Sequence, residues 1–163
     1  MAIMPRPRGG DWLESEIRSL RNEGVDILVS LLEPHEVDEL DLGDEPRRSR
    51  EAGLRFISHP IPDHSTPESL EATSALILDL VRQLRAGQSI AVHCRAGIGR
   101  SATVAAAVLV AHGIPLTETL GLLEEARGFS VPETAEQVLW LEEFARRVAA
   151  RSDAGGRGPQ QRG

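Results

Sequence analysis

The chain has 163 residues, of which 40% are apolar and 26% are charged. This composition is typical of a globular domain, and a chain of about 150 residues can bury a proper core. The net charge of −7 and the aromatic content of 3% argue against a non-specific nucleic-acid binder, an anionic-membrane binder and a base-stacking platform.

The basic residues and the single cysteine restrict the chemistry further. All 18 basic residues are arginine, which excludes lysine Schiff-base chemistry and a Walker-type phosphate lysine. Cys94 is the only cysteine, so neither an internal disulfide nor a cysteine-based zinc site is expected, and a reducing compartment, the cytoplasm, is favoured. No cofactor or metal is predicted, because no histidine pair has metal-ligand spacing. No signal peptide or membrane span is apparent.

The first half of the chain predicts two strands between helical segments. In chain order we expect an extended lead-in (1–10), a helix (12–23), a buried strand (25–32), a short helix (33–42), a charged loop or broken helix (43–53), a second strand (54–60) and a proline-rich loop (61–67). Trp12, Ile17 and Leu20 share one stripe of the first helix, and Trp12 and Trp140 are interpreted as packing residues.

The second half predicts one more strand and four helices. The expected elements are a helix (68–86), a strand (89–93), a glycine-containing loop (94–99), an apolar helix (100–113), two further helices (116–126 and 133–150) and a disordered polar tail (151–163). Strands that alternate with helices predict a single α/β domain over residues 1–150, with a central, mostly parallel sheet of four to five strands flanked by helices.

A loop between the third strand and the apolar helix carries the sequence HCRAGIGRS, residues 93–101. Such a loop lies at the carboxyl end of the sheet, where α/β folds bind ligands. The helix N-terminus supplies free N–H groups, and the two glycines let the backbone curl so that its amides form an anion nest. The candidate phosphate-binding residues are Arg95, Ala96, Gly97, Ile98, Gly99 and Arg100.

Cys94 lies at the mouth of this nest, whose amides favour the thiolate. Arg100 returns to the pocket with a planar guanidinium that can hold two phosphate oxygens. One loop thus supplies a nucleophile, an amide cradle and a cation, which suits attack on a phosphate ester through a covalent phosphocysteine. Taken singly, the residues have ordinary explanations: a buried structural cysteine, a helix-start ion pair for Arg100 and a capping role for Ser101.

The proline-rich loop IPDHSTP provides a candidate acid, Asp63. A carboxylic acid on a stiffened loop can protonate the leaving oxygen and then activate water against the phosphocysteine. Closure of that loop would exclude bulk water. A turn-forming aspartate after Pro62 is the alternative interpretation.

The motif HCRAGIGRS resembles the signature loop of the cysteine-dependent protein tyrosine phosphatases, His-Cys-x5-Arg-Ser/Thr, and most closely that of the small dual-specificity members. The resemblance implies that Cys94 is the nucleophile, that Arg100 binds phosphate and that Ser101 eases departure of the thiolate. It implies that His93 supports the loop and is not the acid. The segment PIPDHSTP resembles the general-acid loop of the family, with Asp63 as the acid.

The resemblance extends over roughly residues 4–148 and adds one supporting residue. A late glutamine, which Gln137 matches, helps place the hydrolytic water in some relatives. A solvated helix position is an equally good interpretation of Gln137. The absence of tyrosine removes the aromatic residue that walls the pocket in phosphotyrosine-specific members, which favours dual specificity.

The leading hypothesis is a monomeric phosphomonoesterase that acts on a phosphorylated protein or peptide, on phosphotyrosine and also on phosphoserine or phosphothreonine. Neither nucleic acid nor a membrane is an expected partner. Two alternatives stay open: a phosphoinositide or RNA 5′-phosphatase on the same scaffold, for which Arg95 is the extra cation, and a phosphate-binding module without turnover.

Two charged segments are interpreted as solvent-exposed. The acidic stretch 33–45 is most simply a solvated face, with the steering of basic substrates as the alternative. Arg47, Arg48 and Arg50 form a basic cluster that we interpret as an exposed loop, with help in binding an acidic substrate as the alternative.

Overall fold

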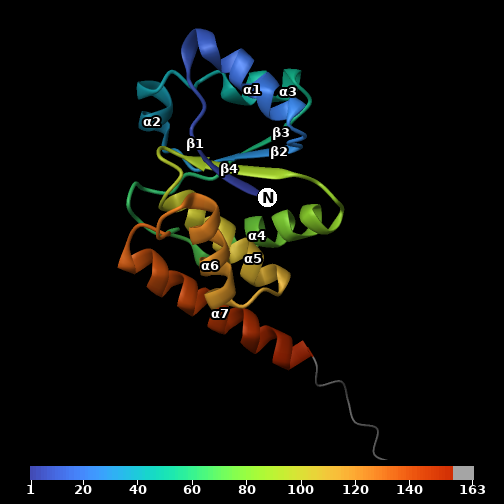
Figure 1. Ribbon diagram of the computed structural model, residues 1–163, viewed down its shortest axis with the longest axis vertical. Helices are drawn as coiled ribbons and strands as arrows, with labels where there is room; N and C mark the ends of the chain where they lie inside the picture. The colour runs from blue at the N-terminus through green and yellow to red at the C-terminus, as the bar shows by residue number, and fades with distance from the viewer. Residues whose placement is uncertain (156–163) are drawn as a thin grey trace, which may run out of the picture.

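Four parallel strands form the centre of the computed structural model, which describes residues 1–155 (Figure 1). They lie in the order β1–β4–β2–β3, with bounds Ala2–Pro5 (β1), Ile27–Ser30 (β2), Arg55–Ser58 (β3) and Ile90–Cys94 (β4). The predicted α/β fold with a parallel sheet is therefore confirmed.

Helices cover both faces of this sheet (Figure 1). On one side lie η1 (Gly10–Trp12), α1 (Leu13–Asn22), α2 (Pro34–Glu39) and α3 (Glu45–Glu51). On the other lie α4 (Leu70–Arg85), α5 (Arg100–His112), α6 (Leu116–Arg127) and α7 (Ala135–Gly155). Within residues 1–155, none of these helices combines the length and the apolar character that crossing a membrane requires.

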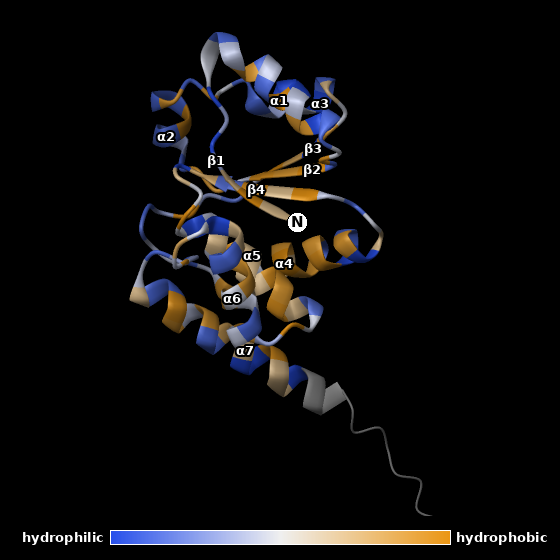
Figure 2. Cartoon of the chain, viewed as in Figure 1, coloured by the Kyte–Doolittle hydropathy of each residue, from blue (hydrophilic) through white to orange (hydrophobic). Residues whose placement is uncertain are grey.

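The strands are buried on both faces because successive side chains point to opposite sides of the sheet. In and just beyond β2, Ile27, Val29 and Leu31 pack into the core shared with α4 to α7. Leu28 and Leu32 pack into a smaller core with α1. The near-continuous apolar run that predicted this strand therefore serves two cores at once, and Figure 2 shows the strands as an apolar layer between the helices.

Helix α5 is the central element of the larger core. Ten of its 13 residues are buried, including Ala105, Ala106 and Ala107. Small side chains let the helix backbone approach the sheet and its neighbours α4, α6 and α7 closely. Because α5 begins directly after the Cys94 loop, its packing fixes the position of that loop.

The structure corrects four predictions at the chain ends and in the charged segments. The predicted lead-in contains the edge strand β1, where Pro5 is tolerated because an edge has few partners. Residues 45–51 form a complete helix, α3.

Trp12 is 57% exposed and lies under the guanidinium of Arg8, so it is not a core residue. Helix α7 continues to Gly155, so residues 151–155 are helical, and the rest of the predicted tail lies outside the described residues.

Replacement of Ala106 by leucine tests the packing of α5. The added methyl groups have no space in the fully buried site, so we expect Ala106→Leu to lower the free energy of unfolding by about 1–3 kcal/mol. Ala149→Leu, on the exposed face of α7, is the matched control and should change it by less than about 0.5 kcal/mol. Chemical denaturation measures both, and equal effects would show that α5 is not tightly packed.

Candidate active site

The candidate site forms at the carboxyl edge of the sheet, where parallel strands release their loops together. Strand β4 ends at Cys94, β3 leads into the loop that carries Asp63, and β2 leads into α2, which carries Glu36. Three chain segments that are distant in sequence therefore meet around one cysteine.

Cys94 lies at the base of its loop and is only 3% exposed. Burial alone would fit a structural cysteine, but polar groups contact its sulfur. The backbone N–H of Gly97 donates to Sγ at 3.3 Å, and Oγ of Ser101 lies 3.4 Å from Sγ. Arg95 and Ala96 are exposed above it, whereas Ile98 is half-buried and packs against the larger core. The loop thus places donors around the sulfur.

Both glycines of the loop are required by close contacts. Gly97 has a φ of +73°, and a Cβ at this position would lie 2.5 Å from the backbone carbon of Met4 in β1. A Cβ on Gly99 would lie 2.9 Å from side-chain atoms of Glu133 and Gln137. The edge strand and the start of α7 therefore pack directly against the loop, which holds its curled conformation.

Arg100 is 1% exposed, and its guanidinium is held on several sides. Nη1 donates to Oε2 of Glu36 at 2.6 Å and to the carbonyl of Ile61 at 3.0 Å, and Nη2 donates to Oε1 of Glu36 at 2.9 Å. Nη2 also lies 2.8 Å from Oδ1 of Asp63. Burial acts to lower the pKa of Arg100, but the hydrogen bond and charge of Glu36, with the charge of Asp63, outweigh it and raise this pKa.

Glu36 is a residue of the candidate site that the sequence interpretation missed. Its carboxylate is buried, and burial acts to raise its pKa. Hydrogen bonds from Arg100 and from the backbone N–H of Glu33 reverse this effect and hold the pKa below its ordinary value. The sequence signal was the capping box that Glu33 and Glu36 form at the start of α2.

Asp63 extends from the loop after β3 and is about half-exposed. Its Oδ1 contacts Arg100 and also accepts the backbone N–H of His64 at 3.1 Å. The structure therefore brings the predicted acid to the predicted phosphate-binding arginine, at the same edge of the sheet as Cys94. A turn-forming role for Asp63 is compatible with the bond to His64 but does not account for the contact with Arg100.

Arg95 is one of the predicted phosphate-binding residues, and its guanidinium pairs with an acidic residue of α2. Its two terminal nitrogens bond the carboxylate of Glu39 at 3.1 and 2.7 Å, and Nη1 is 4.0 Å from Glu36. The hydrogen bond and charge of Glu39 raise the pKa of Arg95. The acidic helix α2 therefore supplies a carboxylate partner to each arginine of the loop, Glu39 to Arg95 and Glu36 to Arg100.

His93 points away from the site because it alternates with Cys94 along β4. It is fully buried on the α3 side, where Nε2 lies 3.0 Å from Oε1 of Glu45, an ion-pair distance without hydrogen-bond geometry. Its predicted supporting role is compatible with this position. Residues 33–45 were predicted to form a solvated face. The structure corrects this prediction, because Glu36 and Glu45 are both buried.

Gln137 lies in α7 and is fully buried, so it does not occupy a solvated helix position. Its Nε2 donates to the carbonyl of Ser65 in the acid loop at 3.0 Å, and its Oε1 accepts the N–H of Thr134 at 3.2 Å. Ser101 is also fully buried beside the sulfur of Cys94. Gln137, predicted as a supporting residue, and Ser101, predicted as a catalytic one, thus both border the site.

Two arginines of the predicted basic cluster have acidic partners outside the site. Arg47 pairs with Asp44 and Glu51, and Arg48 pairs with Glu14 and Glu51, which supports the interpretation of an exposed cluster. Among residues 1–155, no cluster of three histidine, cysteine or acidic side chains could hold a metal ion.

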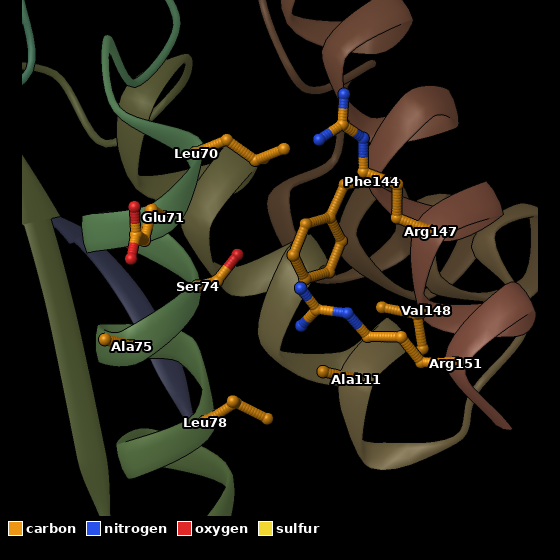
Figure 3. A pocket seen from close by; sticks show the side chains of 10 residues that line it. All are labelled: Leu70, Glu71, Ser74, Ala75, Leu78, Ala111, Phe144, Arg147, Val148 and Arg151. Atoms are coloured by element: carbon orange, nitrogen blue, oxygen red, sulfur yellow. The ribbon is translucent and has the colours of Figure 1, made fainter. Parts of the chain in front are cut away.

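A groove of about 820 Å³ between α4 and α7 is separate from the site (Figure 3). Leu78 and Phe144 contribute to its apolar wall, and Arg147 and Arg151 extend along its α7 side. None of its lining residues belongs to the Cys94 loop or the acid loop.

A family model described as a DSP-PTPase phosphatase of polymorphic toxin systems matches residues 2–114, which include the site. The chain belongs to this family. It is also 31% identical over 100 residues to cyclin-dependent kinase inhibitor 3 of Rattus norvegicus, a match covering 60% of this chain and 47% of that protein. The matched region therefore spans about half the length of this curated relative.

Two solved structures share the fold of this DSP-PTPase. The kinase associated phosphatase (KAP), with its catalytic-site cysteine replaced by serine, superposes with a TM-score of 0.81 at 22% identity, covering 90% of this chain and 85% of that one. Tk-PTP in the active form superposes with a TM-score of 0.71 at 29% identity, covering 89% of each chain.

The acid stability of the DSP-PTPase tests the pairing of Glu36 with Arg100. The pKa of Glu36 in the folded chain lies below its ordinary value of 4.5, so its contribution to stability is fully present above that pH and is lost as pH falls through the folded pKa. Glu36→Gln should lower the free energy of unfolding near pH 7 by about 3 kcal/mol, because Arg100 loses a buried partner. It should also lose less stability than the wild type on acidification.

Denaturation curves at several pH values measure this difference. Glu71→Gln, an exposed position on α4, is the control and should retain the wild-type pH dependence. Parallel acid profiles for Glu36→Gln and the wild type would contradict the assigned ion pair.

Proposed function

We propose that this chain hydrolyses phosphomonoesters of phosphoproteins through a phosphocysteine intermediate. The observation that carries the proposal is the convergence of Cys94, Arg100 and Asp63 at one edge of the sheet. These side chains supply a nucleophile, a cation and an acid, which are the three groups that phosphate-ester transfer to a thiolate requires.

In the first step, the Cys94 thiolate attacks phosphorus and an S–P bond forms while the P–O bond to the leaving group breaks. The guanidinium of Arg100 and the loop amides carry the charge on the phosphoryl oxygens. The carboxylic acid of Asp63 gives its proton to the departing oxygen, which leaves as an alcohol or phenol. Among residues 1–155, no acceptor contacts Nε of Arg100, so this donor remains for a phosphate oxygen.

In the second step, the Asp63 carboxylate accepts a proton from a water molecule while the oxygen of that water attacks phosphorus. The S–P bond breaks and inorganic phosphate leaves. Ser101 lies 3.4 Å from Sγ and can donate its hydroxyl proton in a hydrogen bond to the departing thiolate. Gln137, which bonds the acid loop, is placed to keep that loop over the site during this step.

A phosphorylated protein or peptide is the proposed substrate, with phosphotyrosine and phosphoserine or phosphothreonine both accepted. The exposed loop residues Arg95 and Ala96 leave the entrance open at the surface. The lone thiol supports a reducing cytoplasmic location, and we propose that the protein acts as a monomer.

A phosphoinositide or RNA 5′-phosphatase is less well supported, because both need cations for additional phosphates. Arg95 is the extra cation of the loop, but its guanidinium is already bonded to Glu39. A binding module without turnover is also disfavoured, since the cysteine, the arginine and the acid are all present and close together.

Two substitutions test the proposed roles directly. Cys94→Ser should reduce turnover of a small aryl phosphate by at least ~10³-fold, because the hydroxyl is a far weaker nucleophile. Asp63→Asn should reduce kcat/KM for an alkyl phosphate by ~10²-fold or more, yet change kcat/KM for an aryl phosphate with a good leaving group only slightly, because kcat/KM reports the steps up to departure of the leaving group. Asp11→Asn, at an exposed position outside the site, should behave as the wild type. Full turnover by Cys94→Ser would rule out the mechanism.

The pair between Arg95 and Glu39 yields a prediction about substrate choice. Glu39→Gln frees the guanidinium, so we expect phosphoinositide turnover to rise several-fold relative to phosphopeptide turnover. Glu142→Gln, exposed on α7, serves as the control. A wild-type enzyme that already hydrolyses phosphoinositide faster than phosphopeptide would favour the alternative substrate class.

A further inference from the structure

The acid loop contacts the start of α7 and the segment just before it at two points. Nδ1 of His64 lies 3.3 Å from Oε2 of Glu133, and Nε2 of Gln137 donates to the carbonyl of Ser65 at 3.0 Å. His64 and Ser65 directly follow the proposed acid, Asp63. Contacts between these two segments therefore act within two residues of the catalytic carboxyl group.

His64 contacts Asp63 through both its backbone and its ring. Its N–H donates to Oδ1 of Asp63 at 3.1 Å, and its Nε2 lies 3.6 Å from Oδ2. The residue has a φ of +56°, a left-handed conformation that is uncommon outside glycine, although histidine, asparagine and aspartate adopt it more often than other residues. Such a conformation persists only where surrounding contacts hold it, and the contact with Glu133 is one of these.

Glu133 contacts both loops of the site with one carboxylate. The oxygen that faces His64, Oε2, is also the atom that a Cβ on Gly99 would meet at 2.9 Å. The carboxylate thus fits between the acid loop and the Cys94 loop. The ring of His64 and the side chain of Glu133 are 65% and 38% exposed, so this pair adds little to overall stability. Its consequence is the orientation of the acid loop.

We propose that His64 and Glu133 are positioning residues that hold the carboxyl group of Asp63 over the bound phosphate ester. The proposal rests on the phosphatase function above. The ring of His64 faces the carboxylates of Asp63 and Glu133, and Asp63 in turn faces Arg100. Because the ring lies near Oδ2 of Asp63 and Arg100 contacts Oδ1, the two oxygens are restrained separately and the carboxyl group keeps one orientation toward the leaving oxygen.

The leaving group distinguishes positioning of the acid from a general structural effect. A positioning role requires His64→Asn to reduce kcat/KM for an alkyl phosphate by ~10-fold while it changes kcat/KM for an aryl phosphate with a good leaving group by less than about twofold, because kcat/KM reports the steps up to departure of the leaving group. Asparagine tolerates the positive φ, so this variant removes the imidazole without new backbone strain. Glu133→Gln, which keeps the side-chain size beside Gly99, should show the same selective loss.

Two controls make the result specific to Asp63. His112→Asn, at the exposed end of α5 far from the loop, should leave both rates unchanged. In a double-mutant cycle, His64→Asn should cause no further loss when Asp63 is already asparagine, because the group that it positions is gone.

Equal losses for both leaving groups, additive losses in the cycle, or no loss at all would each overturn the positioning role. These outcomes are distinct from failure of the proposed function. In that case the wild type itself would hydrolyse neither ester faster than Cys94→Ser.

Discussion

Burial of the Arg100 guanidinium is the constraint on which the rest of the site depends. A buried charge is costly unless it is paired and hydrogen-bonded. The carboxylate of Glu36 supplies two hydrogen bonds and the carbonyl of Ile61 a third, so the cation is held at the base of the site. In the proposed mechanism, a phosphate group that enters the loop meets a donor that has already lost its side-chain freedom, and this pre-organisation stabilises the negative charge that develops in the transition state.

The parallel sheet makes this arrangement possible. Alternation along β4 directs Cys94 to the face covered by α5 and His93 to the face covered by α3, so the proposed nucleophile and its neighbour have different environments. The ends of β2 and β3 deliver Glu36 and Asp63 to the same edge. Edge strand β1 packs against Gly97 and closes the loop from the other side. The site is therefore assembled from four chain segments, of which only one carries a strong sequence motif.

The sequence predicted those parts of the molecule whose signals are local. The strand, glycine loop and apolar helix around Cys94 could be recognised because periodicity and motif agree over a short segment. Strand β1 was missed because the prolines and glycines among residues 5–10 indicated an extended lead-in, and because its pairing with β4 depends on a distant segment. Glu36 was missed because its partner Arg100 is 64 residues away, and the capping box alone explains an acidic residue there. The acid loop was predicted from its own residues. Its contact with Glu133 was not, because the two segments lie far apart in the sequence.

The most direct test of the account is to trap the covalent intermediate. Asp63→Asn should still form the phosphocysteine with an aryl phosphate that needs no acid, but it should break this intermediate down slowly because no base activates water. Rapid quenching followed by peptide mass spectrometry should therefore locate one phosphoryl group on Cys94. Steady turnover with no phosphoryl group on Cys94, or with the group on another residue, would contradict the central claim.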